Sequence, residues 1–183
     1  VNHNEEQLNS RFASSNLPLR GAKGWNYEGG IRVPLIVYWP GQTKPQTMSH
    51  SIVTGTDFYP TIMEMLNIPK LPEQHVDGKS FVNALKGKTH ERGAIYWHFP
   101  HYSNHGYQSP GGAIRLGNYK LLEYYENSTV QLFDLHNDPG EQNNLSKSKP
   151  EISKKLLSML HDWRKNVEAK MPQVKTAHNS SRN

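Results

Sequence analysis

A single lysine, Lys23, lies between two glycines in the segment GAKGWNYEGG, residues 21–30. The flanking glycines let the backbone approach a ligand closely, and two aromatic residues, Trp25 and Tyr27, follow. A lysine ammonium is a compact positive charge that suits an oxyanion. The alternative is a solvated loop lysine, which is the common fate of this residue. The glycines, the aromatic residues and the glutamate that follows favour Lys23 as an anion contact.

A second group of candidate residues lies in the segment YWHFPHYSNHGYQSPGGAIR, where His98, His101 and His105 stand among aromatic side chains. Spacings of three and four would converge on a metal only on a helix, and Pro100 and Gly106 prevent one. We therefore predict no metal site here. Two interpretations stay open for these histidines, namely packing at the edge of a sheet and contact with a ligand.

Three elements follow the lysine segment and should position it. The continuous apolar run IRVPLIVY, residues 31–38, has the length and the β-branched content of a buried strand. Residues 54–69 predict a short amphipathic helix that ends before a proline, and residues 77–87 predict a second, shorter helix. The first helix should place four apolar residues on one face: Phe58, Ile62, Met65 and Leu66.

The second half of the chain predicts a small antiparallel sheet and a long helix. Gly117 and Asn118 form a two-residue turn between two of the strands, and Asp-Pro-Gly ends the last one. Apolar residues at 3–4 spacing predict a helix over 150–170 that covers one face of the sheet, and residues 173–183 predict a disordered tail. The four strand segments are AIYWHF, AIRLG, YKLLEYY and VQLFDL.

The composition limits the classes of function. Of the 183 residues 34% are apolar, and the mean hydropathy of −0.79 predicts a thin core. The net charge of +5 suits an anionic ligand but is too small for a nucleic-acid-binding protein. Cysteine is absent, which excludes disulfides and thiol nucleophiles, and no apolar run is long enough for a membrane span. We expect neither a nucleic acid nor a membrane as a partner.

The segment PLRGAKGWNYEGGIRVPLIVYWPG resembles a signature of the sulfatases, the arylsulfatase-like branch of the alkaline phosphatase superfamily. The resemblance covers almost everything from Leu19 to Met171 and keeps the family's order. The later motifs are individually weak and gain specificity as an ordered series: TDFYPTIMEMLNIP, DGKSFVNALKG, AIRLGNYKLLEYY and LFDLHNDPGEQNNL.

The resemblance implies a role for Lys23 as the catalytic lysine that donates hydrogen bonds to the sulfate oxygens. It implies that Glu28 ties the loop down. It also favours the ligand interpretation of the histidine segment, in which His98, His101 and Asn104 contact the leaving group of the substrate. We name two further candidate substrate contacts, Trp25 and Arg115, although a salt-bridged structural role is the alternative for Arg115.

The resemblance also implies a formylglycine nucleophile and a calcium ion in the full-length enzyme. The chain contains no cysteine and no Ser-x-Pro-x-Arg motif, and its metal ligands are missing. We therefore expect the chain to be the C-terminal portion of an exported sulfatase, inactive alone, whose partners are a sulfated substrate and the missing N-terminal part. A phosphonate or phosphate ester hydrolase and a non-catalytic binding or packing module are the alternatives.

The expected fold is α/β, an α+β fragment: the end of a large alkaline-phosphatase-like sheet followed by a small antiparallel subdomain. The predicted division is 1–90 for the catalytic part, 91–172 for the sheet and its helix, and 173–183 for the tail.

Overall fold

The computed structural model describes residues 16–71, 73–74, 77–102 and 108–173. Contacts along the chain divide it into two units, of which one comprises residues 33–93 and the other holds the segments on either side of it. Residues 16–32 thus group with the antiparallel sheet. The predicted division near residue 90 stays a prediction. In the described part of the chain no helix is both long and apolar enough to cross a bilayer.

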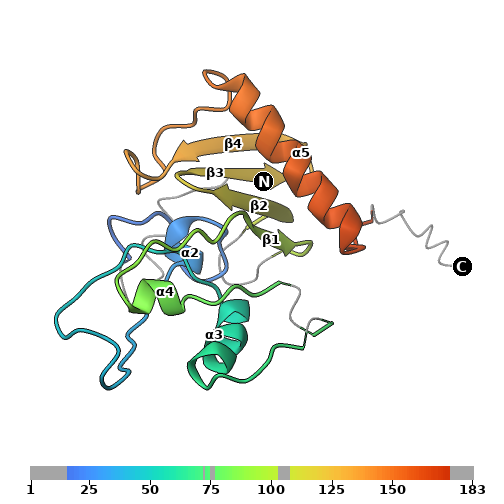
Figure 1. Ribbon diagram of the computed structural model, residues 1–183. Helices are drawn as coiled ribbons and strands as arrows, with labels where there is room; N and C mark the ends of the chain where they lie inside the picture. The colour runs from blue at the N-terminus through green and yellow to red at the C-terminus, as the bar shows by residue number, and fades with distance from the viewer. Residues whose placement is uncertain (1–15, 72, 75–76, 103–107, 174–183) are drawn as a thin grey trace, which may run out of the picture. The chain divides into compact units, whose positions relative to one another are not determined.

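The first unit is built on a four-stranded antiparallel sheet in the order β1-β2-β3-β4, which confirms the predicted subdomain (Figure 1). The turn between β2 and β3 uses Gly117 at a φ of +58°, a backbone conformation that favours glycine. Residues 125–128 turn β3 into β4. The strands are β1 (Ile95–Phe99), β2 (Gly111–Leu116), β3 (Tyr119–Tyr124) and β4 (Thr129–Asp134).

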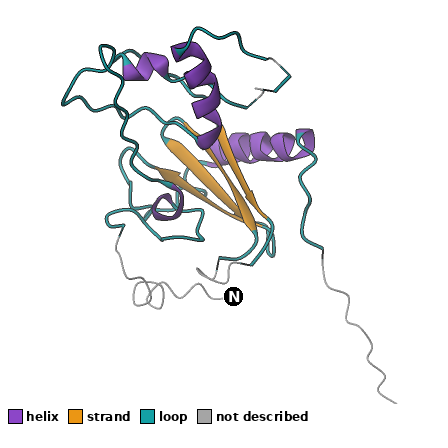
Figure 2. Ribbon diagram, turned by 90° about the horizontal axis from the view of Figure 1, so that it is seen from below, coloured by secondary structure: helices purple, strands orange, loops and turns teal. Residues whose placement is uncertain are grey.

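Helix α5 (Pro150–Asn166) packs on one face of this sheet, as predicted (Figure 2). A proline in its first turn and basic residues in its last turn suit the two ends of a helix. The ring of Trp163 stacks on that of Tyr96 in β1 at a centroid distance of 4.9 Å. The shared apolar core contains Ile114, Leu121, Leu132, Leu156 and Leu160.

The other face of the sheet is covered by the N-terminal segment of this unit. Trp25 and Tyr27 pack there against strand residues of the opposite parity, and the short helix α2 (Glu28–Ile31) follows directly. The strand residues in this second core are Ala113, Leu122, Tyr124 and Phe133. The lysine segment is therefore part of the hydrophobic structure of the sheet unit.

Residues 33–93, the second unit, contain the 3₁₀ turn η1 (Gly55–Asp57), α3 (Phe58–Met65) and α4 (Val82–Leu85). Both predicted helices exist. The fully buried Asp57 carboxylate pairs with Arg92 at 2.8 Å, and it also accepts hydrogen bonds from the backbone N–H groups of Thr54 and Lys79. Much of this unit is thus held by polar contacts to one carboxylate.

The strand predicted over residues 31–38 should pair within a large sheet whose other strands lie in the missing part, so it stays a prediction, and the segment is unpaired in the described chain. Helix α2 includes Ile31, and the residues after it run without strand pairing. The side chains of Val33, Ile36 and Tyr38 are 81%, 92% and 84% exposed. A strand needs a hydrogen-bonding neighbour, and the described residues provide none for this segment. The predicted apolar face of α3 is exposed as well, at Phe58, Ile62 and Leu66.

Candidate functional site

The candidate site is the loop that carries Lys23. The side chain of Lys23 is exposed, whereas Ala22 and Trp25 on either side of it are buried. Gly21 and Gly24 adopt φ values of +74° and +95°, which fold the chain tightly around the lysine. Within the described part of the chain, Lys23 makes no hydrogen bond or ion pair. The loop thus presents one solvent-facing cation on an otherwise buried segment.

Aromatic contacts anchor the loop to the sheet. The rings of Trp25 and Tyr27 stack at a centroid distance of 5.6 Å, and the Tyr27 hydroxyl donates a hydrogen bond of 2.7 Å to Oε1 of Gln131. Burial raises the pKa of Tyr27, so this hydroxyl keeps its proton. The Arg20 guanidinium lies 4.1 Å from the centre of the same ring. These contacts fix the position of the loop on the sheet.

The Gly29-Gly30 pair closes the loop because no side chain fits there. A Cβ atom on Gly29 would lie 2.3 Å from the carbonyl oxygen of Gly21. One on Gly30 would lie 2.1 Å from the carbonyl oxygen of Trp25. Both distances are far below van der Waals contact with backbone atoms that cannot rotate away. Helix α2 therefore packs directly against the backbone of the Lys23 loop.

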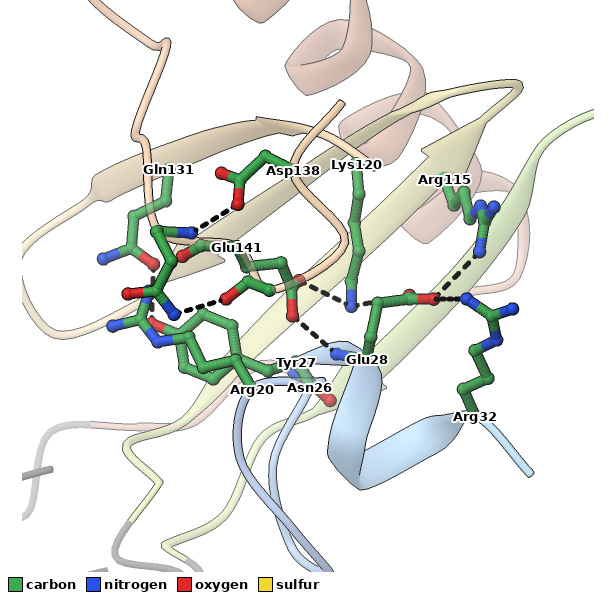
Figure 3. A network of polar contacts seen from close by, with 12 residues as sticks. Arg20, Asn26, Tyr27, Glu28, Arg32, Arg115, Lys120, Gln131, Asp138 and Glu141 are labelled. Carbon is green, nitrogen blue, oxygen red and sulfur yellow. Dashed lines mark hydrogen bonds and ion pairs between the residues drawn. The ribbon is translucent and has the colours of Figure 1, made fainter. Parts of the chain in front are cut away.

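The carboxylate of Glu28 lies at the centre of a buried charge network (Figure 3). Lys120 Nζ lies 3.1 Å from Glu28 Oε1, and Arg115 Nη1 lies 3.0 Å from Glu28 Oε2. Arg32 Nη1 lies at 3.8 Å from the same oxygen. This arrangement agrees with the role of Glu28 that the sequence suggests, a residue that ties the loop down.

Glu141, in the turn after β4, is the second buried carboxylate of the network. Its Oε2 accepts a hydrogen bond of 2.7 Å from the backbone N–H of Glu28, and its Oε1 lies 3.0 Å from Lys120 Nζ. Its backbone carbonyl accepts a hydrogen bond of 2.7 Å from Arg20 Nη1. Burial raises the pKa of Glu141, while Lys120 and the Glu28 N–H oppose that rise.

The buried part of the network pairs two carboxylates with two cations, and the more exposed Arg32 adds a third cation at its edge. Glu28 and Glu141 provide two carboxylates, and Lys120 and Arg115 provide two largely buried cations. Burial lowers the pKa of Arg115, and the neighbouring Glu28 carboxylate opposes that change. Charges that satisfy one another in this way are poor acids and bases for a substrate. The network therefore has a structural role: it fixes the end of the loop that carries the exposed Lys23.

Two predicted contacts are tied to this network or to the core. Arg115 extends from β2 to Glu28, which matches the salt-bridged alternative of the sequence analysis. Trp25 is 2% exposed and packs in the core beneath the loop. The structure therefore brings Lys23, Trp25 and Arg115 to one face of the sheet, with Lys23 as the exposed member. Asn104 lies outside the described residues.

The histidines are placed differently. His98 alternates with Trp97 along β1 and faces α5, on the side of the sheet opposite to the Lys23 loop. Its Nδ1 lies 2.7 Å from the hydroxyl of Tyr125, and its Nε2 lies 2.9 Å from the carbonyl oxygen of Lys170. His101 is exposed, with its ring edge against Phe99. The structure does not bring His98 together with Lys23.

Sequence reasoning missed Lys120 and Glu141. One signal was a lysine inside the apolar strand YKLLEYY, because a fully buried lysine requires a carboxylate partner. The DPGE turn predicted only the end of a strand. No sequence signal connected these two residues to Glu28, more than 90 positions earlier in the chain.

The described residues offer no cluster of metal ligands. In those stretches, no three or more His, Cys, Asp or Glu side chains come together in a way that could hold a metal ion. The calcium that the sequence resemblance implies for a full-length enzyme therefore has no ligand set in this part of the structure.

The chain is similar in sequence to known sulfatases. A family model described as "N-sulphoglucosamine sulphohydrolase, C-terminal" matches residues 22–167. A sulfatase of Formosa agariphila is 34% identical over 166 residues, which is 82% of this chain and 30% of that protein. The N-acetylgalactosamine-6-O-sulfatase of Bacteroides thetaiotaomicron is 28% identical over 149 residues, or 77% of this chain and 29% of that protein. The chain thus spans about a third of the length of these relatives.

Solved structures show the same arrangement. The crystal structure of Ps i-CgsB in complex with k-i-k-neocarrahexaose superposes with a TM-score of 0.71 at 27% identity. The match covers 82% of this chain and 32% of that one. The sheet with its long C-terminal helix is therefore shared with that protein.

Proposed function

Because the chain belongs to the sulfatase family and matches the C-terminal region of its members, we propose that it serves the hydrolysis of a sulfate ester to an alcohol and inorganic sulfate. In this proposal Lys23 contacts the sulfate group. The other groups that the reaction needs come from the part of the protein that corresponds to the remaining two thirds of its relatives.

The observation that carries this proposal is the contrast between Lys23 and its surroundings. A single exposed ammonium stands on a loop whose neighbouring residues are largely buried and whose Gly29 and Gly30 have no space for a side chain. A solvated surface lysine needs no such support. A charge that must meet an oxyanion at a fixed place does, because preorganised charge stabilises a transition state without reorganisation.

The names of the relatives support both substrate classes that the sequence suggests, an aryl sulfate and a carbohydrate sulfate. One relative is an N-acetylgalactosamine-6-O-sulfatase, another was crystallised with a neocarrahexaose, and others are named arylsulfatases. We therefore propose an aryl or carbohydrate sulfate as the substrate. His101, exposed at the end of β1, stays in the proposal as a substrate contact, and so does Asn104 as a sequence prediction. The packed positions of Trp25, His98 and Arg115 favour structural roles.

Formylglycine and calcium enter only through the family. In complete sulfatases they would supply the nucleophile and the positive charge beside it. Among the described residues neither a cysteine nor a cluster of metal ligands is found, so we assign no step to them here.

Sulfate release by the full-length protein tests the proposal. The substrates are 4-nitrophenyl sulfate and 6-O-sulfated N-acetylgalactosamine, and the variants are Lys23→Ala and Lys23→Arg. We expect Lys23→Ala to lower kcat/KM by about 10²–10³-fold, as the removal of one oxyanion donor does. Lys154→Ala is the matched control, since it removes an exposed lysine from α5 and should leave the rate unchanged.

Other results would sink the proposal in different ways. An unchanged rate for Lys23→Ala would make this residue a solvated loop cation. Faster turnover of 4-nitrophenyl phosphate or a phosphonate ester would favour the phosphoryl-ester alternative. No turnover of any ester by the full-length protein would leave a binding or packing module.

A further inference from the structure

We propose that Glu141 is a positioning residue that clamps both ends of the Lys23 loop and thereby fixes where the lysine ammonium lies. The inference rests on the proposed function, since it concerns the placement of the lysine in that same site. It adds a residue from a distant turn, which the sequence analysis treated only as the end of a strand.

The clamp consists of two hydrogen bonds to one residue. At the start of the loop, Arg20 Nη1 donates to the backbone carbonyl of Glu141 at 2.7 Å. At the end of the loop, the backbone N–H of Glu28 donates to Glu141 Oε2 at 2.7 Å. Lys23 lies between these two points in the sequence. The loop is thus held at both ends by a single residue, as Figure 3 shows.

Glu141 is itself held rigidly. It is fully buried and has a φ of +52°, a left-handed backbone conformation that residues other than glycine rarely adopt. The turn around it is fixed by Asp138, whose carboxylate accepts hydrogen bonds from the backbone N–H groups of Gln142 and Asn143 at 3.0 and 2.8 Å. The backbone N–H of Glu141 donates to the carbonyl oxygen of Asp138 at 3.1 Å. The surroundings therefore impose the conformation of the clamp.

Lys120 connects the clamp to the sheet. Its ammonium lies 3.0 Å from Oε1 of Glu141 and 3.1 Å from Oε1 of Glu28. Lys120 belongs to β3, which is paired on both sides, to β2 and to β4. Rotation of the Glu141 carboxylate would break either this contact or the hydrogen bond from the Glu28 N–H. Lys120 therefore links the position of the loop to one of the two central strands of the sheet.

This geometry predicts a functional effect that passes through Lys23. A displacement of about 1 Å at a reacting centre can lower a rate by about 100-fold. Loss of the clamp should release the loop by a distance of that order. The effect should vanish when the lysine is already absent, since the clamp would then have no charge to place.

A double-mutant cycle in the full-length protein tests the clamp, with kcat/KM for a sulfate ester as the readout. The variants are Glu141→Ala, Lys23→Ala and the double variant. We expect Glu141→Ala to lower kcat/KM by about 10- to 100-fold alone and by far less in the Lys23→Ala background. Glu141→Gln, which keeps an acceptor oxygen for the Glu28 N–H, should restore most of the rate.

The matched control lies on the other face of the sheet. Arg164 and Glu123 form an ion pair of 2.7 Å whose side chains are only 10% and 11% exposed, so Arg164→Met removes a mostly buried charge contact on the face opposite to the loop. Its effect on kcat/KM should be small and additive with that of Lys23→Ala. Exchange of the Glu28 amide hydrogen should be faster in Glu141→Ala than in Arg164→Met. This measurement detects loss of the clamp without relying on enzyme activity.

Two results would overturn the clamp, and they differ from each other. If Lys23→Ala slows the enzyme but Glu141→Ala adds its full effect in that background, Glu141 does not act through Lys23, while the proposed function stands. If Lys23→Ala has no effect, the clamp and the site assignment both fail. Should Glu141→Ala not fold, the same cycle with Arg20→Met removes the other hydrogen bond of the clamp and decides between the same outcomes.

Discussion

The two faces of the four-stranded sheet are covered in different ways. On one face α5 contributes leucines that meet apolar strand residues, with the Arg164–Glu123 ion pair at the end of the helix. On the other face a loop and a short helix lie over a core that also contains Lys120, Glu28 and Glu141, all buried. The first face is covered mainly by apolar packing, and the second combines an aromatic and apolar core with directional contacts between charges.

The difference follows from what each face has to hold. Apolar side chains of suitable volume attach a helix firmly and tolerate small shifts, because dispersion and hydrophobic contacts have little directionality. A loop that presents one charge needs hydrogen bonds and ion pairs, which are lost when a group moves by an ångström. The loop face therefore uses buried charges that an ordinary core avoids.

The largest expected effect comes from removal of the shared cation of the loop face. Lys120→Met leaves Glu28 and Glu141 buried without the ammonium between them. We expect the free energy of unfolding to fall by about 4 kcal/mol, because a broken buried ion pair leaves charge uncompensated. Urea unfolding of the chain, followed by tryptophan fluorescence, measures this change. A loss below about 1 kcal/mol would mean that water already reaches these carboxylates.

A cavity in the helix face should have a somewhat smaller effect. Leu160→Ala removes a fully buried side chain between α5 and the sheet and should lower the free energy of unfolding by about 3 kcal/mol. Amide hydrogen exchange sharpens the contrast between the faces. In Leu160→Ala the exchange of the α5 amides should be accelerated more than that of the amides of residues 21–30. In Lys120→Met the amides of residues 21–30 should be accelerated more.

A single neutral hydrogen bond on the loop face should contribute less. The Tyr124 hydroxyl donates to that of Tyr27 at 3.1 Å, and both rings belong to the core on this face. Tyr124→Phe should lower the free energy of unfolding by about 1 kcal/mol. Burial raises the pKa of Tyr124, so this cost should not vary between pH 6 and pH 9. A cost that changes over that range would point to a different group.

The smallest effect is expected at the exposed end of β4. The side chain of Asn137 and the backbone N–H of His136 donate to Asp134 and lower its pKa below the ordinary value of an aspartate. A carboxyl group with a lower pKa in the folded state stabilises the fold above its unfolded pKa. That contribution is lost as the pH falls through the folded pKa. The small advantage of the parent over Asp134→Asn at pH 6 should therefore disappear in acid, and an advantage that persists there would contradict this.

The helix face could be predicted from the sequence almost completely. The 3–4 spacing of the leucines in α5 and the turn at Gly117 are local patterns, and each one specifies its own element. The loop face could be predicted only in part. The glycines around Lys23 pointed to a backbone that could approach a ligand closely, but the contacts of Glu28 with Lys120 and Glu141 join three segments that are distant in the chain. The periodicity of apolar residues is a local pattern and does not predict which charged residues of distant segments will contact one another.

The strand predicted at residues 31–38 depends on distant segments in a similar way. Hydrophobicity and β-branching indicate that a segment can pair, but pairing also requires a neighbour. The pattern identified an apolar segment, which is exposed in the described chain. The sequence interpretation places its partner strands in the missing part of the enzyme, so the pairing itself stays a prediction.

The exposed segment after α2 also has a consequence for the behaviour of the chain in concentrated solution. Leu35 to Trp39 is a short apolar run without charge, the composition that favours self-association into β-structure. Pro34 and Pro40 flank it, and neither can donate a backbone hydrogen bond to an incoming strand. The two prolines act as gatekeepers that limit how far such intermolecular pairing can spread along the chain.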